Sequence, residues 1–268
     1  MESTKQDILS ALKSMSRVIY ALILRESKTR YGRLKIGYLW AFLEPMLFIA
    51  VLSLIFTYAR NLSSGAMPPI LFYTTGILPF FLFRDIMTKT MSAIQGNYQL
   101  LTFPQVQVFD LIIARTLLEM ATYIIVFTVL VSIISLLGIE PVDIEDPMRL
   151  LMGAVLISLL ALGIGFAMSA LVPLFPVVQF LVGSILIRPL FFISGIFFTA
   201  DIIPEHIRHY ALYNPLLQLS EMMRSAFFRE FESEHVNLSY LFGFTLCVLF
   251  FGMLLQRALK RHAMRIPI

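Results

Sequence analysis

The chain has 268 residues, of which 58% are hydrophobic and 14% are charged, and it carries a formal net charge of +4 at pH 7. Soluble domains have about 45–50% apolar and about 25% charged residues, so this composition excludes an ordinary soluble protein and predicts that most of the chain lies in a bilayer. With one cysteine and four scattered histidines, the sequence excludes a disulfide framework and holds no recognised metal-site motif.

The first predicted element is an amphipathic helix within the amino-terminal segment, residues 1–35. Apolar residues recur at steps of three and four between residues 7 and 24, with polar residues on the opposite side. The segment carries eight lysines and arginines and lacks a cleavable small-residue site, so we do not expect a signal peptide. We expect the helix to lie along a membrane face, to pack on a partner protein, or to do both.

Six segments are candidate membrane spans, because a helix needs about 20 residues to cross the bilayer. We predict an all-α membrane protein with spans at residues 36–58, 70–93, 109–137, 148–172, 177–199 and 238–256, followed by a tail at 257–268. The second span is predicted to be short or broken, because its apolar run ends at Arg84 and Asp85. The prolines at 173 and 176 predict a sharp turn between the fourth and fifth spans.

The distribution of the basic residues predicts the orientation of the chain. Fifteen of the 21 lysines and arginines fall on the side that holds the two chain ends, and six fall on the other side or inside the spans. Positive charge concentrates on the cytoplasmic side of membrane proteins, so we predict that both termini are cytoplasmic. This distribution indicates membrane orientation and not nucleic-acid binding.

Two connecting segments are long enough to have functions of their own. Residues 84–109 are too polar to be buried in lipid, and they form either a cytoplasmic surface that meets a soluble motor or an ordinary loop. The candidate contact residues in this segment are Lys89, Gln95, Asn97, Tyr98, Gln99 and Phe103. Residues 200–236 contain an amphipathic stretch on the opposite side, which either enters the bilayer and returns or lies on the outer leaflet.

Charged residues inside the spans are the next signal, because each must face protein or water. Arg188 lies midway along the fifth span beside Pro189, which predicts a kinked helix with a cation. Arg188 either lines a polar conduit or pairs structurally with Glu44 or Glu119. Arg115 and Glu119 are four residues apart, and we expect them mainly to neutralise each other.

Small residues recur at steps of four in the fourth predicted span, at Ala161, Gly165 and Ser169. This spacing lets helix backbones approach closely, so it predicts tight packing within the chain or across a dimer axis.

Enzymatic chemistry has little support in the sequence. No Gly-Lys dipeptide is present, so the chain has no phosphate-cradling loop and is not expected to hydrolyse ATP. The acid and base residues worth testing are Asp201, Glu205, His206 and His209, which would suit a membrane enzyme acting on lipid-linked sugar. We treat that as the weaker alternative to a transporter.

Two stretches of sequence resemble a known family. Residues 29–45, TRYGRLKIGYLWAFLEP, place a basic, tyrosine-containing run before Leu39-Trp40 and Pro45 at the entry to the first span. A later stretch carries Ser194-Gly195, Pro204, Asn214-Pro215 and Arg224, with a less usual Gln218. Together with the order of segments, these residues resemble the permease subunits of ABC exporters for bacterial surface polysaccharides, and most closely the capsular polysaccharide (KpsM-type) permeases.

The resemblance implies a homodimer bound to two copies of a separate cytoplasmic ATPase, which would bind ATP and Mg²⁺, so that this chain needs no cofactor or metal. It also implies the inner membrane of a Gram-negative bacterium, a periplasmic polysaccharide co-polymerase and an outer-membrane exporter. The cargo would be a lipid-linked capsule glycan threaded between the two copies. O-antigen, teichoic acid, a drug or haem remain alternative cargoes within the same exporter class.

The candidate substrate and channel residues follow from both lines of reasoning. Arg30, Arg33 and Lys35 form a basic cluster that either attracts the phosphate of the glycan's lipid anchor or binds ordinary anionic lipid. The other candidates are Tyr38, Trp40, Glu44, Arg84 and Arg188.

Overall fold

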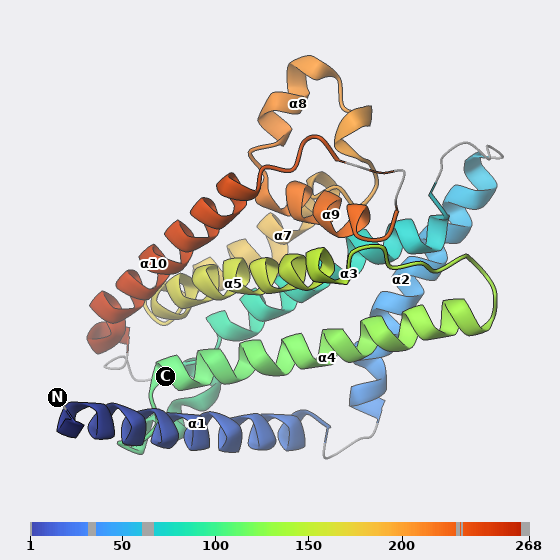
Figure 1. Cartoon of the computed structure of the whole chain (residues 1–268). Coiled ribbons are helices and arrows are strands. Elements are labelled where there is room, and N and C mark those ends of the chain that lie inside the picture. The colour runs from blue at the N-terminus through green and yellow to red at the C-terminus, as the bar shows by residue number, and fades with distance from the viewer. Residues whose placement is uncertain (1, 32–35, 61–66, 229–230, 232, 264–268) are drawn as a thin grey trace.

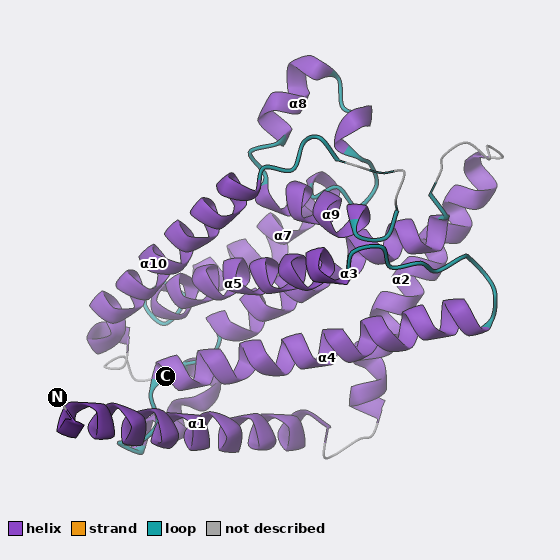
Figure 2. Ribbon diagram, viewed as in Figure 1, coloured by secondary structure: helices purple, strands orange, loops and turns teal. Residues whose placement is uncertain are grey.

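The computed structural model describes residues 2–31, 36–60, 67–228, 231 and 233–263. Within these residues the regular elements are all helices, joined by loops and with no strand, as Figure 2 shows, and this confirms the predicted all-α fold. The longer helices are α1 (Glu2–Tyr31), α2 (Ile36–Arg60), α3 (Pro69–Met91), α4 (Val108–Leu136), α5 (Pro147–Leu171) and α10 (Leu238–Ala263). The shorter elements are η1 (Gln95–Thr102), α6 (Val177–Phe180), η2 (Leu181–Leu186), α7 (Ile187–Ile193), η3 (Ala200–Ile202), α8 (Glu205–Ala211) and α9 (Pro215–Ser225).

Five helices among the described residues are long and apolar enough to cross a membrane, namely α2, α3, α4, α5 and α10. The remaining predicted span corresponds to the shorter apolar stretch Val177–Ile193. α3 is the central helix, because 78% of its apolar window is buried inside the protein, against 17% for α2 and for α10. The bundle is therefore built around α3, with α2 and α10 at its outside.

α3 runs without interruption from Pro69 to Met91, through Pro79 and through Arg84 and Asp85. The prediction of a broken second span is therefore wrong, and the first eight residues of the predicted cytoplasmic segment 84–109 belong to this helix. Glu140 supports its first turn, because its two carboxylate oxygens each lie 2.9 Å from a backbone nitrogen, those of Ile70 and Leu71.

The fifth predicted span has an irregular backbone. A π-helical turn, η2, joins α6 to α7 and ends just before Pro189, which has no amide proton to donate. This agrees with the predicted distortion near Arg188. The helix ends at Ile193 and not at residue 199, and Gly195 follows with a φ of +74°, a conformation that favours glycine.

The small residues of α5 bring it close to α10. A Cβ atom added to Gly163 would lie 2.8 Å from the Cα atom of Leu249, and one added to Gly252 would lie 2.0 Å from the carbonyl oxygen of Gly163. Neither approach leaves room for a side chain. Of the two arrangements that the sequence allowed, the structure shows close packing within the chain.

Different helices lie at the two ends of the bundle. α1 lies across one end, beside the start of α4, while α8 and α9 lie at the opposite end (Figure 1). Leu22 of α1 is buried in an apolar cluster with Ile94, Ile112 and Phe166. The predicted amphipathic helix is therefore confirmed as a helix, and part of its apolar face packs on the chain's own bundle.

The segment after the fifth span separates into an exposed and a buried part. No residue of α8 is buried, whereas every residue of α9 from Leu216 to Arg224 is buried. α9 packs against α3, α5 and α10. The alternative in which both helices lie on the outer leaflet is therefore wrong for α9.

Candidate functional site

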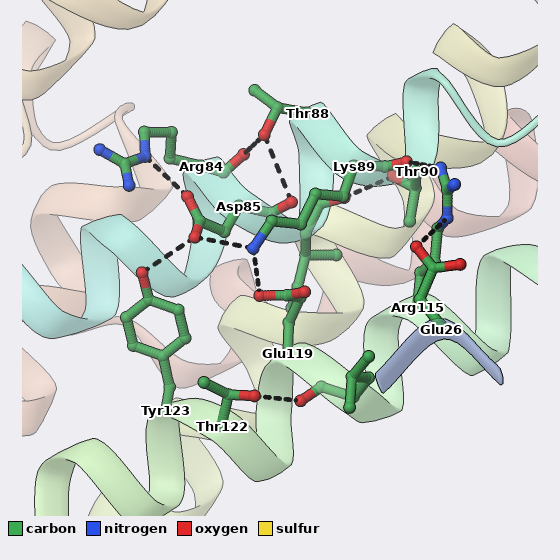
Figure 3. A network of polar contacts seen from close by, with 12 residues as sticks. Glu26, Arg84, Asp85, Thr88, Lys89, Thr90, Arg115, Glu119, Thr122 and Tyr123 are labelled. Atoms are coloured by element: carbon green, nitrogen blue, oxygen red, sulfur yellow. Dashed lines mark hydrogen bonds and ion pairs between the residues drawn. The ribbon is translucent and has the colours of Figure 1, made fainter. Parts of the chain in front are cut away.

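A network of charged side chains lies at the end of α3 that is nearest to α1 (Figure 3). Asp85 is at its centre: one carboxylate oxygen lies 2.8 Å from Nε of Arg84, and the other lies 3.1 Å from Nζ of Lys89. The hydroxyl of Tyr123, on α4, donates to the same carboxylate at 3.1 Å. These contacts place two cations and one hydroxyl around a single carboxylate.

Glu119 is the most deeply buried charged group of this network, with 1% of its side chain exposed. Its carboxylate lies 2.6 Å from Nζ of Lys89, which is half-buried and also pairs with Asp85. A buried carboxylate without a cation would be unstable, so the position of Lys89 is strongly constrained. Lys89 thus joins α3 to α4 by an ion pair.

The network extends to α2 through Arg84. Its Nη1 atom lies 2.8 Å from Oε1 of Glu44, and its guanidinium carbon lies 4.0 Å from the centre of the Phe81 ring. The sequence placed Glu44 and Arg84 among separate channel candidates, whereas the structure pairs them with each other. The pair connects the outer helix α2 to the central helix α3.

α1 joins the network through two further arginines. Arg115 of α4 lies with its Nε atom 3.4 Å from Oε1 of Glu26, and it also donates to the backbone carbonyl of Lys89. Arg25 donates from Nη1 to Oδ1 of Asn97 at 2.9 Å, which ties α1 to η1. Four long helices and η1 are therefore joined by charged hydrogen bonds within one region.

The candidate ATPase-contact residues fall into two groups. Lys89 and Asn97 are engaged inside the protein, the first with Glu119 and the second with Arg25. Tyr98, Gln99 and Phe103 are exposed, and Gln95 is half-buried. Only part of the predicted set is thus available to contact another protein.

The remaining channel candidates are described to different extents. Arg33 and Lys35 lie outside the described residues, and Arg30 and Tyr38 are described only by their helical backbone. Trp40 is exposed on α2.

Arg188 is exposed on α7 and makes no hydrogen bond or ion pair within the described part of the chain. Glu44 and Glu119 pair with Arg84 and Lys89 instead. The structural ion pair offered as an alternative role for Arg188 is therefore wrong.

The later motif of the sequence organises a buried turn at the other end of the bundle. Asn214 caps α9 by accepting from the backbone of Leu216 at 3.0 Å, and its amide donates to the carbonyl of Ile193 at 2.9 Å. Arg224 is fully buried, donates to the carbonyl of Phe198 at 3.2 Å and stacks over Phe72.

The buried guanidinium of Arg224 lies close to the carboxylate of Glu221. Burial lowers its pKa to about 10, while the nearby carboxylate of Glu221 favours the protonated form. Glu221 in turn accepts a hydrogen bond from the backbone of Ala200 at 2.7 Å. The motif therefore has a structural role, which is to hold the turn after α7 against α9.

The acid and base residues considered for an enzyme do not form a common centre. Asp201 pairs with His235 at 3.1 Å, and the hydroxyl of Tyr213 lies 3.4 Å from Nε2 of His209. Among the described residues no group of three or more His, Cys, Asp or Glu side chains could hold a metal ion.

Sequence reasoning missed Asp85, Tyr123 and Glu26 as members of the charge network. Asp85 carried a signal, because an acidic residue inside an apolar helix requires a partner. No sequence signal pointed to Tyr123 or Glu26, since each lies far in sequence from the residue that it contacts.

Comparisons with known proteins agree with this architecture. Residues 17–228 match the ABC-2 type transporter family. The chain is 37% identical to the polysialic acid transport protein KpsM of Escherichia coli, over 89% of this chain and 92% of that protein. It is 31% identical to the capsule polysaccharide export inner-membrane protein CtrC of Neisseria meningitidis, over 94% of both chains. It is also 29% identical to the capsule polysaccharide export inner-membrane protein BexB of Haemophilus influenzae, over 92% of both chains.

Proposed function

Since the chain belongs to the ABC-2 type transporter family, we propose that it is the membrane-spanning permease subunit of an ATP-driven exporter for capsular polysaccharide. The observation that carries this proposal is the match, over nearly their whole lengths, to proteins named for polysialic acid transport and for capsule polysaccharide export. The cargo is a capsule glycan on a lipid terminus, moved outward across the inner membrane of a Gram-negative bacterium. Both chain termini lie in the cytoplasm.

The energy for transport comes from two copies of a separate cytoplasmic ATPase, which bind ATP and Mg²⁺. Support for this step is the absence of a phosphate-binding loop from the sequence and the presence of an exposed surface on η1 and the turn after it, at Tyr98, Gln99 and Phe103. Movement of η1 reaches α1 through the hydrogen bond between Arg25 and Asn97.

The charge network carries this movement further into the bundle. The ion pair between Lys89 and Glu119 makes α3 and α4 move together, and the pair between Arg84 and Glu44 adds α2. Ion pairs away from bulk water are stronger than exposed pairs, so the helices respond as a unit. ATP binding then shifts the population between closed and open arrangements of the permease.

The permease works as a homodimer, and Arg188 supports this part of the proposal. Its charge lies on an outer face of α7 whose neighbours Ile185 and Phe192 are exposed and apolar. A cation facing lipid costs about 2.5–3.5 kcal/mol at a helix centre, whereas one facing a wet passage costs little. A second copy of the chain would cover this face and enclose the passage.

Further partners complete the route to the cell surface. A periplasmic polysaccharide co-polymerase and an outer-membrane polysaccharide exporter receive the glycan. On the cytoplasmic side, Arg30, Arg33 and Lys35 attract the phosphate of the lipid anchor, since fixed cations bind phosphate through charge-assisted hydrogen bonds.

Reconstitution tests the proposal directly. Vesicles that contain this protein and its ATPase should accumulate lipid-linked capsular polymer when ATP is added, and vesicles that lack the ATPase should not. Arg188→Leu should abolish transport while leaving dimer formation intact, and Arg188→Lys should retain transport because the charge remains. Transport without nucleotide, or full transport by Arg188→Leu, would contradict the proposed energy source or the wet passage, respectively.

The contact with the ATPase has its own test. Phe103→Ala should weaken stimulation of ATP hydrolysis by the permease, because an exposed aromatic side chain is a strong anchor at protein interfaces. Ile207→Ala is a matched control, since Ile207 is similarly exposed but lies on α8 at the other end of the bundle. Equal ATPase stimulation by the two variants would place the contact elsewhere.

A further inference from the structure

An open pocket of about 630 Å³ lies at the α8 end of the bundle, where the chain that enters α10 passes α8 and α9 (Figure 1). Small-molecule sites usually have about 300–1,000 Å³, so this pocket has room for a ligand of that class. Its wall mixes aromatic and polar side chains, among them His209, Tyr213, Gln218, Glu234, Asn237 and Tyr240. The charge network at the opposite end does not involve any of them.

The wall of the pocket is held in place by its own hydrogen bonds. The hydroxyl of Tyr240 donates to the backbone carbonyl of Tyr213 at 2.6 Å. Gln218 donates from its amide to the carbonyl of Leu212 at 2.6 Å and accepts from the backbone of Asn237 at 2.9 Å. Because these bonds join α9, the turn before it and the start of α10, little ordering is required when a ligand binds.

Other polar groups of the wall are available for a ligand. Within the described chain, the carboxylate of Glu234, the hydroxyl of Ser239 and the side-chain nitrogen of Asn237 have no hydrogen-bond partner. They supply one acceptor, one donor and one group that does both. This combination suits a ligand whose own groups both donate and accept, as hydroxyl groups do.

An aromatic surface accompanies these polar groups. Tyr213 is 60% exposed, and its ring contacts that of His209 edge to face, with centres 5.3 Å apart. An exposed aromatic face buries the apolar C–H face of a ligand while the polar edge of the ligand stays hydrogen-bonded. A sugar ring has both features, an apolar face and a rim of hydroxyl groups.

We propose that this pocket binds a neutral saccharide unit of the exported polymer on the far side of the membrane, an inference that rests on the proposed function. The charge of the wall favours neutral sugars. Among the described residues that line the pocket, Glu234 supplies a carboxylate and none is a lysine or arginine, while the two imidazoles, His209 and His235, already contact Tyr213 and Asp201. A carboxylated sugar would place a second carboxylate beside Glu234, whereas a neutral sugar adds no like charge. The pocket therefore holds the polymer after it leaves the passage and slows its return.

Binding of two defined oligosaccharides to the full-length protein in lipid nanodiscs tests the inference. The probes are a neutral tetramer of N-acetylglucosamine and an acidic tetramer of sialic acid, measured by calorimetry and saturation-transfer NMR. The neutral tetramer should bind, and Tyr213→Ala should weaken its binding about tenfold. Tyr210→Ala is the matched control, because Tyr210 is 72% exposed on the adjacent helix but does not line the pocket.

Glu234→Gln should allow the acidic tetramer to bind by removing the opposing charge. Failure of the neutral tetramer to bind, equal losses in the two tyrosine variants, or tighter binding of the acidic tetramer by the unmodified protein would each overturn the inference. Vesicle transport separates the two proposals. ATP-driven transport without binding in the pocket refutes the pocket alone, whereas pocket binding without transport refutes the proposed function and leaves the pocket intact.

Discussion

The close approach of α5 and α10 makes a quantitative prediction for Gly252→Ala. The added Cβ would lie 2.0 Å from the carbonyl oxygen of Gly163. Carbon and oxygen atoms of neighbouring helices approach to about 3.3 Å at best, so the two helices would have to separate by about 1.3 Å. The obstructing atom belongs to the backbone and cannot rotate away.

The magnitude follows from a comparison with a second glycine of the same helix. Gly243→Ala adds the same methyl group where no described atom outside its own stretch of helix backbone lies within 4 Å, so it has no steric cost within the described chain. Both changes gain the same helix propensity, about 1 kcal/mol, which cancels in the comparison. What remains is the overpacking term at Gly252, about 3 kcal/mol at the upper end of its usual range.

Thermal unfolding of the two variants in the same detergent measures this difference. We expect Gly252→Ala to unfold roughly 6–12 °C below Gly243→Ala, according to the entropy of unfolding for a chain of this size. The fraction of protein that remains monodisperse in gel filtration after heating is a suitable readout. If the two variants unfolded at the same temperature, the contact between the α5 and α10 backbones would be refuted.

Two further changes test the ion pairs and the cap of α3. Lys89→Met should destabilise the protein by about 3–5 kcal/mol because it leaves Glu119 buried without that cation. Combining Lys89→Met with Glu119→Leu should recover most of this loss, and a double variant as unstable as the single variant would contradict the pairing. Glu140→Ala should lower the free energy of unfolding by about 1 kcal/mol, because it removes the acceptor for the backbone N–H groups of Ile70 and Leu71. Denaturant titration measures this loss, and Glu145→Ala is the control because the Glu145 carboxylate caps no helix in the described chain.

The sequence was a good guide to the helices themselves. Hydropathy and length located the starts of the five long apolar helices and of the shorter stretch Val177–Ile193 to within one residue. Two predicted ends are wrong: the fifth segment ends at Ile193 and not at 199, and α10 continues to Ala263 and not to 256. A chain in a bilayer must satisfy its backbone hydrogen bonds within each segment, so local composition is enough to predict where helices occur. The small residues of α5 likewise predicted a close helix contact, although not which helix it meets.

The charged residues show where sequence reasoning stopped. Arg115 and Glu119 are neighbours on one helix face, yet the structure gives them partners on α1 and α3, namely Glu26 and Lys89. Lys89 was predicted to contact a partner protein, and the structure shows that its half-buried side chain bridges Asp85 and Glu119. Spacing along one helix cannot reveal which groups on other helices complete a buried ion pair, because that depends on how the helices are rotated and packed.

Composition and hydropathy alone thus determined that this is a helical membrane protein, since those properties are local, and the resemblance of two motifs to a known family indicated the exporter class. Only the tertiary structure decided that Glu44, Asp85 and Glu119 share the cations of α3, and that Tyr213 and Glu234 face one pocket. These groups lie far apart in sequence, and the packing of the helices decides which of them come close enough to interact.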